Sequence, residues 1–225
     1  MSINQNVLGL IFASINDSAV IDLTKLRTMG SIPYGGRYRM VDFPLSNMVN
    51  SGISEVGVIT KSNYGSLLDH LGSGREWDLA RKKGGLHLLP PFGVNTRGDY
   101  TGTAEALNAV ISYVRNIPES EIVLMPADIV CNLDLAAAIA QHDASGCGIT
   151  AICRGGAVTG EHHRYLTDAH GRVTKLITSA SAGTGVAAME IYIVNKDVLL
   201  SILDFCAQEN LSLIHISEPT RHAQI

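Results

Sequence analysis

Apolar runs of strand length alternate with amphipathic stretches along most of this chain. Val7–Ala13, Glu55–Thr60 and Glu121–Met125 are nearly continuous apolar runs, which is typical of strands covered on both faces. Helical periodicity is expected over Thr103–Val114. Further strands are expected at Leu86–Pro90, Gly148–Cys153, His170–Thr178 and Ala188–Val194, and further helices at Ser66–Leu71, Leu133–His142 and Val198–Ala207. This alternation predicts an α/β fold with a doubly wound, mostly parallel sheet, in one domain over residues 1–210.

Composition narrows the classes of function. With 225 residues, of which 46% are hydrophobic, the chain can bury a sizeable core, which excludes intrinsic disorder. A net charge of -4 and an aromatic content of 5% argue against binding of nucleic acid. The sequence lacks both a long apolar span and the basic start of a signal peptide, so we expect a cytoplasmic protein with no membrane association.

The last fifteen residues, 211–225, do not continue the helix expected before them. Their core, SLIHISEPTR, resembles the translation of a sequencing adapter. We therefore expect a non-native, poorly ordered tail on a truncated gene product. A genuine polar tail is the alternative.

The most distinctive stretch is an arginine-rich turn that follows two adjacent glycines. Alternation places Arg37 and Arg39 on one face, and Asp42 can turn back to pair with one of them. These arginines could orient phosphates or hold a subunit contact. The alternative is an internal Arg–Asp ion pair that locks the turn onto the next helix, which we expect to open at Pro44 and close at Gly52.

A second candidate lies at a junction between a loop and a helix. The backbone N–H groups of Gly102, Thr103 and Ala104 could hold a phosphate or a base edge at the helix N-terminus. The alternative is structural: Thr101 or Thr103 caps the helix and Gly102 eases the turn.

Asp128 follows the third buried run, at the carboxyl end of that expected strand. Ligands of open α/β sheets bind at this end of the strands, and a carboxylate there can hold Mg²⁺. A turn or helix cap is the alternative. His70, His162 and His163 show no metal-ligand spacing and are expected to be polar surface residues.

Taken in order, these stretches resemble the ADP-glucose pyrophosphorylase (glucose-1-phosphate adenylyltransferase) family of sugar nucleotidyltransferases. The resemblance covers roughly residues 7–205 and rests on GGRYRMVDFPLSN, NSGI, EVGVIT, LLP, GTAEA and the acidic residue after VLMPA. It implies a Rossmann-like catalytic domain that converts ATP and glucose 1-phosphate to ADP-glucose and pyrophosphate with Mg²⁺, in glycogen synthesis. It also implies a following left-handed β-helix domain, which we expect to be missing from this truncated chain.

The phosphate-binding loop departs from the family pattern. Where the family has A-G-G-x-G-T-R-L, this chain has ASINDSAV over Ala13–Val20. Such a loop needs glycines so that its N–H groups approach the triphosphate, and an arginine to neutralise the leaving pyrophosphate. Here Ile15 restricts the backbone, Asp17 adds a negative charge beside the phosphate, and Ala19 carries no charge. Efficient catalysis is therefore not expected.

Two other phosphate partners are lost as well. The Lys-Pro of the family aligns with Met29-Gly30, and its Glu-Lys aligns with Thr178-Ser179. This pattern is similar to that of the GlgD-type subunit, a non-catalytic or weakly catalytic relative. We expect it to pair with a catalytic subunit in a hetero-tetramer and to bind ATP or ADP-glucose weakly. The residues left as vestigial candidates are Ala13, Ser14, Gly102, Thr103 and Ala104 for the nucleotide, and Asp128, Arg37 and Arg39 for catalysis.

Two alternatives remain at this point. An active adenylyltransferase with a modified loop would use Asp128 on Mg²⁺ and Arg37 or Arg39 on phosphate, but the loop composition speaks against it. A dinucleotide-dependent oxidoreductase would need a G-x-G-x-x-G turn after the first strand, and the sequence has none there.

Overall fold

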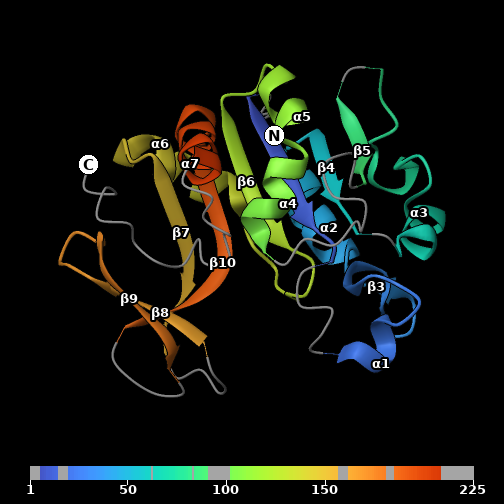
Figure 1. Ribbon diagram of the computed structural model, residues 1–225, viewed down its shortest axis with the longest axis horizontal. Coiled ribbons are helices and arrows are strands. Elements are labelled where there is room, and N and C mark those ends of the chain that lie inside the picture. Colours follow the sequence, from blue (N-terminus) through green and yellow to red (C-terminus); the bar gives the residue numbers. More distant parts are fainter. Residues whose placement is uncertain are drawn as a thin grey trace.

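The computed structural model describes residues 6–14, 20–61, 63–82, 84–90, 102–156, 162–180 and 185–208 (Figure 1). The tail at 211–225 and residues 15–19 of the phosphate loop lie outside these ranges, so the expectations for them are not addressed. The main sheet consists of β1 (Val7–Phe12), β4 (Glu55–Ile59), β5 (Gly85–Leu89), β6 (Glu121–Pro126), β7 (Ile149–Arg154), β8 (His162–Thr167), β9 (Val173–Ala180) and β10 (Val186–Asn195). A separate hairpin pairs β2 (Pro33–Tyr34) with β3 (Tyr38–Arg39). The helices are α1 (Ile21–Thr24), α2 (Asp42–Asn50), α3 (Gly65–Leu71), α4 (Thr103–Ala109), α5 (Ile111–Asn116), α6 (Leu135–Ser145) and α7 (Lys196–Gln208), with 3-10 turns η2 (Met29–Ser31) and η3 (Arg75–Trp77).

The centre of the sheet is parallel and doubly wound, as predicted. Its order is β5-β4-β1-β6, and each neighbouring pair runs parallel. Every residue of β1 is buried, which explains its continuous apolar run. Beyond β6 the sheet continues through β10, which is antiparallel to β6, β7 and β8, while β9 pairs antiparallel with β8. This outer half rests on long-range pairing that the hydrophobic pattern does not specify.

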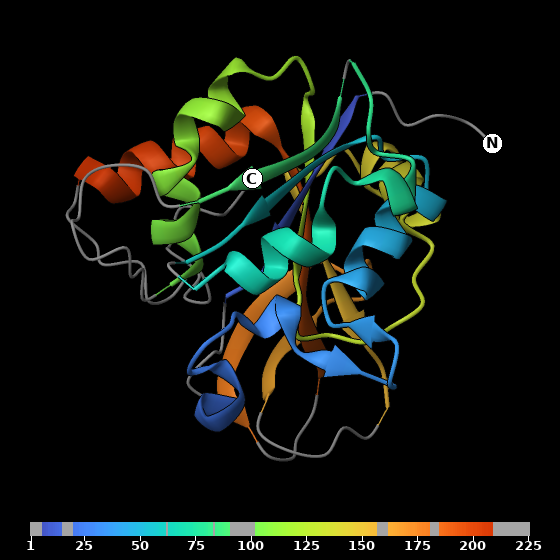
Figure 2. The same cartoon turned by 90° about the vertical axis from the view of Figure 1, so that its right-hand side faces the viewer.

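Helices cover both faces of the sheet and enclose two cores. One core packs Leu45 and Met48 of α2 and Ile139 of α6 against the sheet. The other packs Leu107 of α4 and Leu203 of α7 against the opposite face. Figure 2 shows this layering, with α4 and α7 on one side of the sheet and α2 on the other. Within the described ranges, no helix is long and apolar enough to cross a membrane.

Several elements differ from the sequence-based expectation, among them α2, which begins at Asp42 and not at Pro44; two further differences follow. The helix predicted over Thr103–Val114 is broken at Val110, whose backbone (φ -109°, ψ 11°) ends α4 before α5 begins. Val110 and Ile111 are consecutive β-branched residues, and these are less favourable in a helix. The second difference is β8, a strand that was not expected. It contains His162 and His163, which were expected only to be polar surface residues. It forms because β9 and β10 both pair with it.

Candidate functional site

The candidate site lies at the carboxyl ends of the central strands, which is the usual place of the ligand-binding crevice in open α/β sheets. From β1 the chain moves to β4 and β5 on one side of the sheet, and then crosses over to β6 on the other side of β1. This reversal of strand order next to β1 is the place where open α/β sheets bind ligands. Because Phe12 is paired with Pro126, Ser14 and Asp128 each lie two residues beyond the end of adjacent strands.

The end of β1 is tied firmly to β4. The amide of Ala13 donates to the carbonyl of Ile59 at 2.9 Å, and the amide of Lys61 donates to the hydroxyl of Ser14 at 3.1 Å. Both Ala13 and Ser14 are buried. The hydroxyl of Ser14 therefore helps to fix the start of the phosphate loop.

Met29 and Gly30 pack directly beneath this strand end. The amide of Gly30 donates to the carbonyl of Ala13 at 2.8 Å, and its carbonyl accepts from the amide of Val41 at 3.0 Å. A Cβ at position 30 would lie only 3.1 Å from the Cβ of Ala13. Met29 itself is 8% exposed. Thus the position that the resemblance aligns with a phosphate-binding lysine holds a buried thioether in this chain.

Asp128 is half-buried and follows β6. The amide of Ala127 beside it donates to the carbonyl of Phe12 at 3.0 Å, which fixes this turn to the end of β1. Among the residues that the structure describes, no three His, Cys, Asp or Glu side chains come together to hold a metal ion. Within these residues, Asp128 would supply one oxygen ligand to Mg²⁺, which is usually bound by one or two carboxylates together with nucleotide phosphates.

The junction before α4 is formed by backbone groups at the start of the helix. Gly102 is the N-cap residue of α4, in an extended conformation (φ -148°, ψ 168°), and it has no side chain with which to cap the helix. Thr103 is the first helical residue, so the expectation that Thr103 caps the helix is wrong; Thr101 lies outside the described ranges. Ala104 is buried against the core. The candidate nucleotide residues Gly102, Thr103 and Ala104 therefore lie together at the start of α4.

The arginine-rich turn has a structural connection that differs from the expected ion pair. The guanidinium of Arg39 donates to the carbonyl and hydroxyl of Ser66 at 2.6 and 2.8 Å, whereas Arg37 is exposed on the hairpin. Asp42 accepts a bond of 2.9 Å from the backbone amide of Arg39 rather than from its guanidinium. The turn is locked onto its surroundings, as the structural alternative expected, but through these other contacts.

The carboxylate of Asp42 also pairs with His70, which the sequence analysis placed on the surface. The Nε2 of His70 lies 2.6 Å from Oδ1 of Asp42, and the two side chains are only 22% and 12% exposed. Trp77 also packs edge-on against the His70 ring, at a centroid distance of 5.9 Å. The expectation for His70 was therefore wrong. A separation of 28 residues between Asp42 and His70 leaves no local pattern from which to find the pair.

A β-bulge in β10 lies at the same end of the sheet as the crevice. The pairing of β10 with β7 shifts register between Ala188 and Ile191, and Glu190 in this bulge has φ 55°. The hydroxyls of Tyr165 and Tyr192 are 3.0 Å apart. Burial raises the pKa of both tyrosines, and the nearby Glu190 carboxylate raises it further. Thr178, aligned with the sugar-phosphate Glu-Lys, is exposed near the end of β9.

Comparisons with known proteins agree on one family. The sequence profile of the nucleotidyl transferase family matches residues 11–219. The glycogen biosynthesis protein GlgD of Bacillus subtilis is 37% identical over 153 residues, which cover 68% of this chain and 45% of that protein. A glucose-1-phosphate adenylyltransferase of Pseudothermotoga lettingae is 34% identical over 212 residues, which cover 92% of this chain and 50% of that protein. The chain therefore spans about half the length of these relatives.

A solved structure supports the fold. A crystal structure described as a glucose-1-phosphate thymidylyltransferase of Bacillus anthracis, in complex with a sucrose, superposes with a TM-score of 0.72. The match covers 91% of this chain and 78% of the Bacillus anthracis chain, at 17% sequence identity. At this level of identity the likeness shows the fold alone.

Proposed function

Because this chain belongs to the nucleotidyl transferase family, we propose that it acts in glycogen biosynthesis as a GlgD-type, regulatory subunit. In this proposal it modulates a catalytic glucose-1-phosphate adenylyltransferase, with which it forms a hetero-tetramer. Two GlgD proteins among its relatives, from Bacillus subtilis and Geobacillus stearothermophilus, are 37–38% identical to it over about two thirds of its length.

The observation that carries the proposal is the packing of Met29 and Gly30. In the family that the sequence resembles, a lysine at position 29 meets phosphate. In this chain, the side chain at position 29 is buried, and the amide of Gly30 is bonded to the end of β1. The packing around the crevice thus contains an apolar side chain at the position where the family has a positive charge.

A second candidate function is an active sugar-phosphate adenylyltransferase. It is favoured by the 92% of this chain that the Pseudothermotoga enzyme covers, and by Asp128 and the start of α4, which each follow the carboxyl end of a parallel strand. In this case Asp128 would hold Mg²⁺ with the phosphates of ATP, and the ion would polarise the phosphoryl group. The buried Met29 speaks against this candidate, since it leaves the developing negative charge with one partner fewer.

One assay distinguishes the regulatory subunit from the active enzyme. Pyrophosphate release from ATP and glucose 1-phosphate with Mg²⁺ is measured for the chain alone, and then in mixtures with a catalytic glucose-1-phosphate adenylyltransferase from the same source. A regulatory subunit gives no turnover alone but changes the rate or the substrate KM of the mixture. Asp128→Asn serves as the matched variant: it leaves that effect in place for a regulatory subunit and abolishes turnover for an active enzyme. Turnover by the chain alone that is lost in Asp128→Asn would contradict the proposal.

A further inference from the structure

A groove opens between α1 and the start of the β2–β3 hairpin. It has a volume of about 520 Å³, and α1 lies next to the hairpin at the lower right of Figure 1. Its apolar lining consists of Leu23, Leu26, Ile32 and Pro33. Within the described part of the chain, none of the candidate nucleotide residues lines this groove.

The apolar side chains of the groove are unusually exposed. Leu26 is 87% exposed and Leu23 is 57% exposed, and Ile21 on the same short helix is exposed as well. Single exposed leucines are ordinary on a protein surface, but several that gather at one groove indicate an interaction site. A small ion bound in the groove would leave these side chains in water, whereas a protein surface would cover them. The groove therefore fits a protein partner.

The wall of the groove on the hairpin side is already formed in the isolated chain. The amide of Ile32 donates to the carbonyl of Met29 at 3.1 Å, and the amide of Met40 donates to the carbonyl of Ile32 at 3.0 Å. All three residues of η2, which precedes Ile32, are buried. A partner that binds here has to order little of this backbone, which lowers the cost of association.

The charged residues around the groove leave it with a positive charge. The ammonium of Lys25 lies 2.8 Å from the carboxylate of Asp22, so these two charges balance each other. Arg27 also lines the groove, and no carboxylate in the described ranges forms an ion pair with it. Arg37, which is exposed on the hairpin, has no such ion pair in these ranges either. A complementary partner presents an apolar side chain with a carboxylate beside it.

A second copy of this chain does not supply that surface through a two-fold contact. In such a contact the same patch lies on both sides of the interface. The positive groove would then face another positive groove, and the like charges of the two Arg27 side chains would oppose association.

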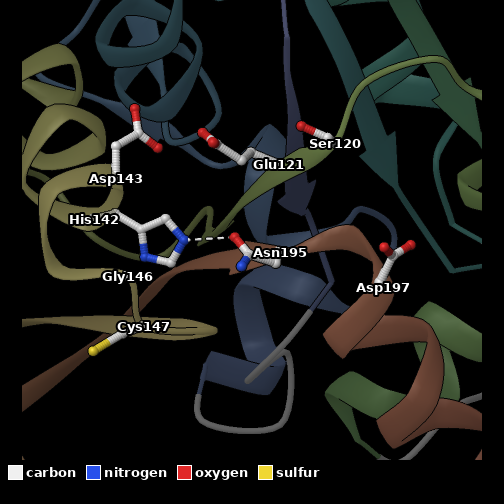
Figure 3. Close-up of a pocket in the computed structure, with 8 residues that line it drawn as sticks. All are labelled: Ser120, Glu121, His142, Asp143, Gly146, Cys147, Asn195 and Asp197. Carbon is white, nitrogen blue, oxygen red and sulfur yellow. Dashed lines mark hydrogen bonds between the residues drawn. The ribbon is translucent and has the colours of Figure 1, made fainter.

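A head-to-tail contact between copies is no better matched. The chain has an acidic hollow of about 350 Å³ where β6 and α7 begin, lined by Glu121, Asp143 and Asp197 (Figure 3). Its remaining described lining is polar or small, and includes Asn195, whose Oδ1 lies 2.9 Å from Nε2 of His142. This hollow matches the charge of Arg27 but offers no aliphatic or aromatic side chain to cover the leucines. A head-to-tail contact would also tend to repeat into an open chain of subunits.

We propose that the groove docks a different protein, the catalytic glucose-1-phosphate adenylyltransferase subunit, which covers Leu23 and Leu26 with an apolar side chain and pairs a carboxylate with Arg27. This inference rests on the proposed function and adds to it the surface at which the two subunits meet. The sequence analysis left a subunit contact open for Arg37 and Arg39. Because Arg39 is bonded within the chain to Ser66, Arg37 is the one of the two that is free to extend this contact.

Sedimentation velocity of the intact chain mixed with a catalytic glucose-1-phosphate adenylyltransferase from the same source tests the groove. The wild-type chain should form a complex with that subunit. Leu26→Glu places a charge in the apolar contact and should raise the Kd at least about ten-fold. Arg27→Glu reverses the charge of the groove and should do the same. Val173→Glu makes a similar change at a 50% exposed position on β9 and should bind like the wild type. Circular dichroism checks that each variant is folded.

Four results would overturn the proposal. A wild-type complex that Leu26→Glu and Arg27→Glu leave unchanged would rule out the groove but leave the proposed regulatory function standing. An equal loss of binding in Val173→Glu would show that the contact is not confined to the groove. Self-association of the chain alone, lost in Leu26→Glu, would mean that a second copy covers the groove. Absence of any complex with the wild-type chain would contradict the docking groove and the proposed function together.

Discussion

At the scale of single residues, Glu190 carries backbone strain in the described chain. A non-glycine residue in the left-handed region costs about 1–2 kcal/mol, and Glu190 adopts φ 55° in the bulge of β10. We expect Glu190→Gly to be more stable than Glu190→Ala by about 1 kcal/mol, as measured by urea unfolding. Both variants remove the carboxylate and its effect on Tyr165 and Tyr192, so the difference isolates the backbone. Equal stabilities would show that the bulge carries no strain at this position.

Asp42 is a second residue whose role is local. It accepts hydrogen bonds from the amide of Arg39 and from His70, and it is 9% exposed. Asp42→Ala leaves two poorly solvated donors without their acceptor, which should lower the free energy of unfolding by about 2–3 kcal/mol. Arg37→Ala, on the exposed part of the same hairpin, should change it by less than about 0.5 kcal/mol. Chemical denaturation of both variants checks this. A similar loss in both would mean that the hairpin, rather than Asp42, is the sensitive element.

At the scale of elements, the sequence analysis was most accurate for the strands that are buried on both faces. The strands β1, β4 and β6 were predicted within a residue of their ends, because both of their faces are covered and their apolar runs are continuous. The break at Val110 and the strand β8 were missed, since a local break and partial exposure leave a weak pattern. Tertiary pairing with β9 and β10 decides β8, and no periodicity within the segment reports that pairing.

The packing of α2 on β1 depends on the absence of a side chain at Gly9. A Cβ at this position would overlap the sulfur of Met48, which is fully buried in α2. Gly9→Ala should therefore destabilise the protein by about 1–3 kcal/mol through overpacking. In the double variant with Met48→Ala, the new methyl group enters the space left by the methionine. The loss of stability in the double variant should then be smaller than the sum of the losses in the two single variants. A double-mutant cycle by thermal unfolding measures this coupling. Additive losses would show that Gly9 is needed for a reason other than α2.

At the scale of the whole molecule, the sequence predicted which edge of the sheet carries the candidate site but not how its parts are held. Asp128 was expected at the carboxyl end of its strand, the edge at which open α/β sheets bind ligands, and it lies two residues beyond β6. The burial of Met29 and the bond from Gly30 to Ala13 were not predictable, because both depend on how the segment before the hairpin packs under β1. The same holds for Asp42 and His70, which meet only through the placement of α3.

This packing sets a limit on how catalysis can be restored. In the double variant Met29→Lys/Gly30→Pro, which recreates the Lys-Pro of the resembling family, the proline removes the amide that donates to Ala13 at 2.8 Å. The lysine would place an ammonium where the present side chain is 8% exposed. We expect this variant to lose about 2–4 kcal/mol of stability and to release no more pyrophosphate than the wild type. Met29→Leu, which keeps the volume and apolar character of position 29, should stay within about 1.5 kcal/mol. A stable Lys-Pro variant with increased pyrophosphate release would show instead that the crevice still has the parts of an active site and lacks only this charge.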